Sequence, residues 1–199
     1  MSKAVLISIR PQWCQKIASG EKTIEVRKTK PKLETPFKCY IYCTGDKHLA
    51  FMQNASGTNL IACMNAETAI PVGGAIGNGR VVGEFTCDRI DRLSPANEPY
   101  GIYDIGDDYV FQTCLENGAL WDYGHGTPLY GWHISNLKIY DAPKKLREFW
   151  RDCLEYSELS TNCWSCENVC GDGDETDCNT DGRLYLRRPP QSWCYVEEG

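Results

Sequence analysis

The sequence predicts one α+β domain in which a mixed or antiparallel sheet carries a few short helices. Short runs of β-branched and aromatic residues recur between turn residues, and helical periodicity is confined to short segments. There is no internal repeat, and residues 73–79 lack the Gly-x-Gly-x-x-Gly spacing of a doubly wound nucleotide fold. A chain of 199 residues suffices for one sizeable core, so we treat residues 1–199 as a single domain.

The chain is predicted to open with a strand, a helix and a second strand. Residues 4–9 form a short apolar run typical of a strand, and Pro11 suits the first turn of the helix that follows. Gly20 is expected to end this helix, because glycine readily adopts the left-handed conformation found after many helices. Residues 23–28 predict the second strand.

Two further strands are predicted on either side of an insertion with little pattern. Residues 37–44 are mostly aromatic and β-favouring, and they predict the first of these strands. Residues 45–78 show no clear period, and we interpret them as a poorly patterned insertion. Asn78-Gly79 is typical of a hairpin turn, and residues 80–90 then predict a long strand.

The second half of the chain predicts shorter elements. A short helix is expected near residues 115–123, and a strand over residues 129–140 with a break near Ser135-Asn136. The apolar spacing of residues 144–150 predicts another short helix. The chain is expected to close with a strand over residues 192–196.

An acidic, Cys-rich excursion occupies residues 151–188, before the closing strand. Its spacing C-x2-C-x3-C-x7-C is made by Cys163, Cys166, Cys170 and Cys178. Four thiolates can hold a structural zinc ion tetrahedrally and so order a segment that is too polar to build a core. We therefore expect structural zinc here, with free thiols in a loose loop or disulfides as the alternatives. The other eight cysteines are scattered mostly among apolar neighbours and need no functional explanation.

The charge of the chain is unevenly distributed. The formal net charge is -6, yet residues 1–50 carry +6, residues 51–150 carry -5 and residues 151–199 carry -7. The overall acidity argues against a protein that coats nucleic acid, whereas the basic first quarter suits either a local anionic ligand or a solvated face. Without a signal segment or an apolar run that could cross a membrane, we expect a cytoplasmic protein with no membrane partner.

The second predicted strand is the strongest candidate for a functional site. Alternation places Glu25 and Arg27 on one face, with Lys22 at the start of the strand. Glu25 would hold Lys22 charged for binding a phosphate, whereas burial beside Arg27 would lower the pKa of Lys22 and let it act as a base or nucleophile. An ion pair that only braces the fold is the alternative. Trp193 is a further ligand-binding candidate, since its ring can stack on a nucleobase, with core packing as the alternative.

These residues carry a resemblance to a known family. Gly20-x-Lys22-x-x-Glu25-x-Arg27 resembles the signature of the ASCH domain, a member of the PUA-like superfamily. Residues 79–88, 128–141 and 189–198 resemble ASCH proteins of prophages and gut bacteria. The likeness covers most of the chain outside residues 45–75 and 151–185. It implies a PUA-like small mixed β-barrel, a cleft beside the signature strand, and RNA or a nucleoside or nucleotide as the ligand.

The resemblance also implies two activities, amide hydrolysis of N4-acetylcytidine and ribonuclease action. In the amidohydrolase branch the signature lysine, here Lys22, works with a threonine at the position of Glu25 and with a later glutamate, for which Glu98 lies in a comparable region. Lys22 and Glu25 are thus the candidate catalytic residues, and the cleft requires no cofactor.

Three hypotheses for function follow. The first is an RNA-binding or modified-nucleoside-binding domain, and the second is a hydrolase that uses the same cleft. The third is a phage protein-interaction module, in which the acidic Cys-rich end contacts an unknown protein partner.

Overall fold

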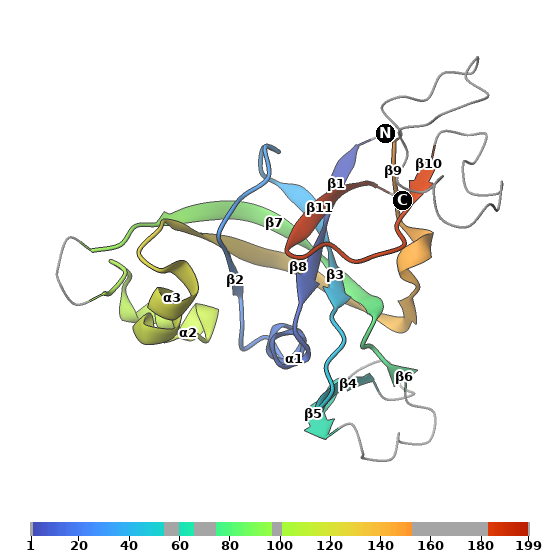
Figure 1. Ribbon diagram of the computed structural model, residues 1–199, viewed down its shortest axis with the longest axis horizontal. Helices are drawn as coiled ribbons and strands as arrows, with labels where there is room; N and C mark the ends of the chain where they lie inside the picture. The colour runs from blue at the N-terminus through green and yellow to red at the C-terminus, as the bar shows by residue number, and fades with distance from the viewer. Residues whose placement is uncertain (1, 54–59, 66–74, 97–100, 153–182, 199) are drawn as a thin grey trace.

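A six-stranded mixed sheet forms the centre of the molecule (Figure 1). The computed structural model describes residues 2–53, 60–65, 75–96, 101–152 and 183–198. The six strands are β1 (Lys3–Ile9), β2 (Ile24–Arg27), β3 (Phe37–Cys43), β7 (Arg80–Leu93), β8 (Leu129–Lys144) and β11 (Trp193–Glu197). Their order is β11-β1-β3-β7-β8-β2, in which β1 and β3 run parallel and the other neighbours antiparallel. The predicted α+β class with a mixed sheet is confirmed.

The predicted strand-helix-strand opening is present. β1 leads into α1 (Pro11–Ala18), and β2 follows it. All of residues 4–9 are buried, and α1 directs Cys14 and Ile17 into the main core cluster. Gly20 has a φ of +81°, so the chain leaves α1 through the left-handed conformation that glycine adopts at little cost.

Residues 45–78 contain more regular structure than their sequence pattern indicates. β4 (Leu49–Gln53), β5 (Leu60–Asn65) and β6 (Ala75–Ile76) form a second, three-stranded sheet. The turn at Asn78-Gly79 is present, but the predicted hairpin is wrong, because β6 pairs with β4 and not with β7. The Asn78 side chain fastens the turn to β4: it accepts from the Phe51 amide at 2.7 Å and donates to the Leu49 carbonyl at 2.8 Å.

Two helices cover one end of the long β7–β8 ribbon (Figure 1). α3 (Asn117–Gly124) corresponds to the helix predicted near residues 115–123, whereas α2 (Asp107–Thr113) has no counterpart in the sequence prediction. Leu120 of α3 belongs to one core cluster with Val26 of β2 and Leu129 of β8. The helices are therefore packed against the strand that carries the candidate site.

The helix predicted for residues 144–150 is wrong. β8 continues to Lys144, which pairs with Val81, and a single 3₁₀ turn, η1 (Leu146–Glu148), follows. Leu146 and Phe149 are both buried, and the Phe149 ring centre lies 4.9 Å from that of Tyr40. A spacing of three residues places both side chains on one side of a 3₁₀ turn, so the apolar pattern does not require an α-helix. The chain then extends into β9 (Trp150–Asp152), which pairs with β10 (Arg183–Tyr185).

The predicted β-barrel is not closed in the part of the chain that the structure describes. β11 and β2 are the edges of the sheet, and each pairs on one side only. Side chains link the two ends of the sheet: Arg27 donates to the Ser8 carbonyl at 2.6 Å, and Trp193 donates to Thr29 Oγ1 at 3.0 Å. Hydrogen-bonded strands lie about 4.8 Å apart. Because whole side chains span the gap between the two ends of this sheet, the ends are too far apart for backbone pairing, and an opening remains between them.

Candidate functional site

A pocket of about 490 Å³ lies at this opening of the sheet. β2 forms one wall, the end of β1 and the segment before β11 form another, and α1 and α3 contribute side chains. Its lining includes Lys22, Glu25 and Arg27, which the sequence predicts to act together, and the aromatic residues Trp13 and Tyr123. The fold therefore brings the three charged residues to one concave site.

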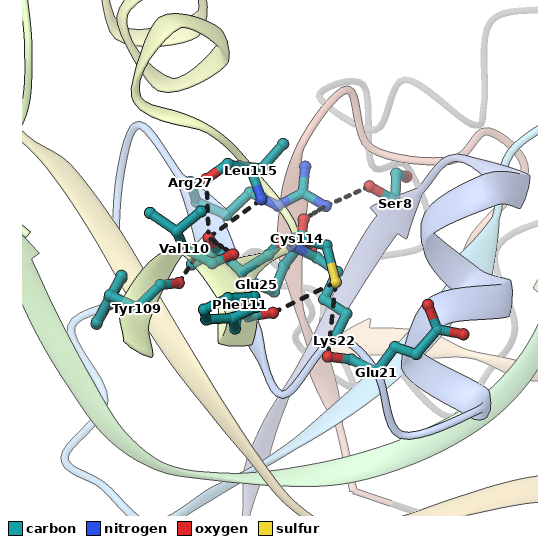
Figure 2. Close-up of polar contacts among 11 residues, drawn as sticks. Ser8, Glu21, Lys22, Glu25, Arg27, Tyr109, Val110, Phe111, Cys114 and Leu115 are labelled. Atoms are coloured by element: carbon teal, nitrogen blue, oxygen red, sulfur yellow. Dashed lines mark hydrogen bonds and ion pairs between the residues drawn. The ribbon is translucent and has the colours of Figure 1, made fainter. Parts of the chain in front are cut away.

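Lys22 is buried at the C-terminus of α2 (Figure 2). Its side chain is 2% exposed, and its Nζ donates a hydrogen bond to the Thr113 carbonyl at 2.6 Å. The last carbonyls of a helix lack partners within the helix, so the ammonium satisfies one of them and suits the negative end of the helix dipole. The Thr23 amide donates to the Gln112 carbonyl at 2.9 Å, which fastens the start of β2 to α2. Lys22 Nζ also lies 5.2 Å from the centre of the Trp13 ring.

The Glu25 carboxylate lies between two cations (Figure 2). Its Oε2 is 3.4 Å from Lys22 Nζ, and its Oε1 is 3.0 Å from Arg27 Nη2. The same Arg27 nitrogen donates to the Ser8 carbonyl of β1 at 2.6 Å. Strand alternation explains why Glu25 and Arg27 share a face, as predicted. Both faces of β2 are nevertheless buried, so the polar face is a pocket wall and not a solvated surface.

Burial lowers the pKa of the Lys22 ammonium below its usual value, because the charged form loses its hydration inside the protein. The neighbouring Glu25 carboxylate acts in the opposite direction, but its effect is the smaller of the two. The sequence predicted that burial would lower the pKa of Lys22 and that Glu25 would raise it. Both effects are present, and the effect of burial on the pKa is the larger. The site holds a lysine whose ammonium gives up its proton more readily than a surface lysine does.

Two buried polar atoms of this charged group have no hydrogen-bond partner among the described residues. They are Glu25 Oε2 and Arg27 Nε. Proteins satisfy most of their buried polar atoms, because an unpaired buried donor or acceptor costs free energy. The carboxylate and the guanidinium thus retain hydrogen-bonding capacity that the fold does not use.

The structure separates Trp193 from the other predicted site residues. Its ring packs 6.0 Å from that of Trp132 and 5.4 Å from that of Tyr195, and its Nε1 is bonded to Thr29. Gln191 and the residue after it line the pocket, whereas the pocket lining does not include Trp193. A stacking role for Trp193 stays a prediction.

Several contributors to the site carry no signal in the sequence. Thr113 and Ser8 contribute through their backbone carbonyls, so the identity of their side chains does not predict that they contact Lys22 and Arg27. Trp13 and Tyr123 lie on helices 110 residues apart in the chain and meet only in the pocket lining. Of these contributors, the sequence indicates only Trp13, as an aromatic residue in the helix before the Gly-x-Lys-x-x-Glu-x-Arg signature.

The predicted zinc ligands Cys163, Cys166, Cys170 and Cys178 lie outside the described residues, as does Glu98. Within the described ranges, no group of three or more His, Cys, Asp or Glu side chains could hold a metal ion. Six of the cysteines outside the excursion are free thiols, namely Cys14, Cys39, Cys43, Cys87, Cys114 and Cys194. No helix in these ranges is long and apolar enough to span a bilayer.

The fold is similar to that of a known ASCH protein, which confirms the resemblance at the level of the fold. The crystal structure of ASCH from Zymomonas mobilis matches with a TM-score of 0.51 and 16% identity, covering 98% of this chain and 88% of that chain. A serine-to-alanine mutant of the same protein gives a TM-score of 0.51 and 16% identity over 98% and 89% of the two chains. Neither a family model nor a curated protein matches the sequence.

Proposed function

We propose that the chain binds RNA or a modified nucleoside in the pocket beside β2, through Lys22, Glu25 and Arg27. One observation carries the proposal: three charged residues, at 2%, 6% and 8% exposure, line the same pocket. Removing charges from water is costly, and a fold without a ligand to recognise gains little by gathering them around a cavity. Glu25 Oε2, whose contact with Lys22 is an ion pair of 3.4 Å, and Arg27 Nε have no hydrogen-bond partner among the described residues, which supports the same interpretation.

The size and walls of the pocket suit a nucleoside. A volume of about 490 Å³ falls within the range of small-molecule sites. Trp13 and Tyr123 offer aromatic faces on which a base can stack, while Glu25 and Arg27 offer an acceptor and donors for its edge. Stacking and edge recognition together are how single-stranded RNA sites distinguish bases.

Titration of labelled single-stranded RNA and of free nucleosides at low salt tests the proposal. We expect saturable binding, and RNA binding should weaken as salt rises, because salt cations then compete with the cationic side chains for the phosphates. Lys22→Ala combined with Arg27→Ala should abolish binding. A double variant of two exposed cations outside the pocket, Lys138→Ala with Arg92→Ala, removes the same charge and should bind normally.

Circular dichroism of each variant establishes that it has folded. Absence of binding by the native chain would refute the proposal. So would binding that survives loss of both Lys22 and Arg27 in a folded variant.

A hydrolase that uses the same pocket is the second candidate, because the pKa of Lys22 is lowered by burial. A lysine that is closer to neutrality can serve as a base or nucleophile, and Glu25 lies 3.4 Å from it. Incubation with N4-acetylcytidine and with RNA, followed by mass spectrometry, separates amide hydrolysis from ribonuclease action. Intact substrate in both reactions would reject the hydrolase. The protein-interaction alternative depends on residues 151–188, most of which lie outside the described ranges, and it stays a prediction.

A further inference from the structure

Unpaired cations stand at the rim of the pocket, apart from the buried group. Arg10 lines the pocket and is exposed, and it forms no ion pair with any residue in the described ranges. Lys28 is also exposed, and its Nζ lies 5.0 Å from the centre of the Tyr123 ring, which lines the pocket. Asp46 interacts electrostatically with Arg10 without forming an ion pair with it. The rim thus presents two cations that form no ion pair with the described acidic side chains.

α1 adds a second source of positive potential at the same place. Arg10 is the residue that precedes α1, and the first turn of this helix has neither a side-chain cap nor an acidic residue. Pro11 has no amide proton and the Trp13 amide donates to the Arg10 carbonyl at 3.0 Å, so few amides of this turn are free, but the helix dipole still makes this end positive. Trp13 of that first turn lines the pocket, so the uncapped end of α1 adjoins the ligand space.

The buried wall points to the same kind of ligand. Arg27 is 8% exposed and lines the pocket, and its Nε has no hydrogen-bond partner among the described residues. Its Nη2 is already bonded to Glu25 and Ser8, so Nε remains as a free donor of the guanidinium. Guanidinium groups and helix N-termini are the partners that phosphate oxygens prefer in proteins.

We propose that Arg10, Lys28 and the first turn of α1 form a phosphate subsite beside the base pocket, with Arg27 between the two. The inference rests on the proposed function and makes it sharper: the ligand is a nucleotide, free or within an RNA strand, and not an unphosphorylated nucleoside. A carboxylate at Glu25 would repel a phosphate placed deep in the pocket. The base therefore occupies the wall at Glu25, and the phosphate lies at the rim.

The test compares each of the four common ribonucleosides with its 5′-monophosphate and with a short single-stranded RNA, by calorimetry at low salt on the native chain. One charged hydrogen bond to phosphate corresponds to about tenfold in affinity. We therefore expect the monophosphate to bind about tenfold more tightly than its nucleoside, with a steeper salt dependence. A gain for the RNA alone would identify the strand as the source of the phosphate, and a gain for the monophosphate would identify the free nucleotide.

Arg10→Gln with Lys28→Gln should erase the advantage of the phosphorylated ligands over their nucleosides. Both residues are exposed, so these variants remove charge without opening the core. The matched control is Arg92→Gln with Lys138→Gln, which should keep the advantage. Equal affinity of nucleosides and phosphorylated ligands, or an advantage that survives loss of Arg10 and Lys28, would overturn the subsite alone. Failure of every ligand to bind would refute the proposed function as well.

Discussion

At Lys22, burial and charge pairing act against each other on one side chain. The ammonium has one short bond, to the Thr113 carbonyl at 2.6 Å, and a longer contact of 3.4 Å with Glu25 Oε2. The longer contact exceeds the usual range of an N–H···O hydrogen bond, so Glu25 compensates only part of the lost hydration. Its shorter ion pair is with Arg27, at 3.0 Å. The site therefore combines a stable anion–cation pair with a lysine of lowered pKa.

The lowered pKa of Lys22 predicts that the contribution of this residue to stability rises with alkaline pH. Between the folded-state pKa and the ordinary value of 10.5, the unfolded chain binds the Lys22 proton and the folded chain does not. The contribution of Lys22 to the free energy of unfolding must then increase with pH across this window. Lys22→Met removes the contribution, so the difference in unfolding free energy, native minus variant, should grow as pH rises toward 10.5.

Urea unfolding of both proteins from neutral to alkaline pH measures this difference, with Lys138→Met as the control for loss of an exposed lysine. A native-minus-variant difference that falls with rising pH would contradict the prediction.

At the scale of elements, α2 and β8 together set the position of β2. Tyr109 of α2 lies against Gly131 of β8, which pairs with Val26 of β2. A Cβ added at Gly131 would lie 1.7 Å from Tyr109 Oη and 3.0 Å from Ile24 Cγ2. The absence of a side chain at this one position thus lets α2 approach the sheet closely enough for Thr113 to reach Lys22.

Gly131→Ala should therefore destabilise the protein by about 1–3 kcal/mol, the usual cost of overpacking a core. It should also weaken ligand binding, because a displaced α2 no longer holds Lys22. Gly118→Ala is the matched control: a Cβ there meets no atom within 4 Å, and alanine favours a helix over glycine by about 1 kcal/mol. Urea unfolding distinguishes the two, and a Gly131→Ala protein as stable as the native one would show that α2 accommodates the methyl group.

Across the whole molecule, positive charge gathers where the sheet is open. The first 50 residues carry a net charge of +6, and they include the pocket residues Arg10, Lys22 and Arg27. The last 49 residues carry -7, most of it in the Cys-rich excursion. A local field of one sign can attract an anionic ligand even when the net charge of the chain is negative. An overall charge of -6 is therefore compatible with the proposed nucleotide site.

The zinc site stays a prediction of the sequence. Elemental analysis of the full chain, purified without a chelator, should find about one equivalent of zinc if four thiolates bind it tetrahedrally. Replacing Cys163 and Cys166 by Ser should remove the metal, whereas replacing Cys39 and Cys87, which are buried free thiols of the core, should not. A native chain with less than about half an equivalent of zinc would argue against a structural site.

The elements that the sequence predicts well are those whose pattern is local. β1, α1, β2, β3 and β7 each follow from a few neighbouring residues and a turn residue at the end. The break predicted near Ser135-Asn136 is wrong, because β8 runs through these residues; the register shifts there instead, and Asn136 has a φ of +48°. The apolar pattern of residues 144–150 led to a wrong helix prediction, because apolar residues three apart fit both an α-helix and the 3₁₀ turn that forms. The sequence did not predict α2, because its short sequence lacks a clear apolar face.

The sequence by itself predicted that three charged residues lie together in the candidate site, because Glu25 and Arg27 alternate on one short strand and Lys22 lies two residues before it. It did not determine their environment. Lys22 meets a carbonyl 91 positions away and Arg27 one 19 positions away, and burial depends on how these distant segments pack. Tertiary structure alone decided that the sheet stays open, that the opening becomes a pocket, and that desolvation outweighs Glu25 at Lys22. The physical reason is that strand periodicity acts between neighbours in the chain, whereas hydration and ion pairing act between neighbours in space.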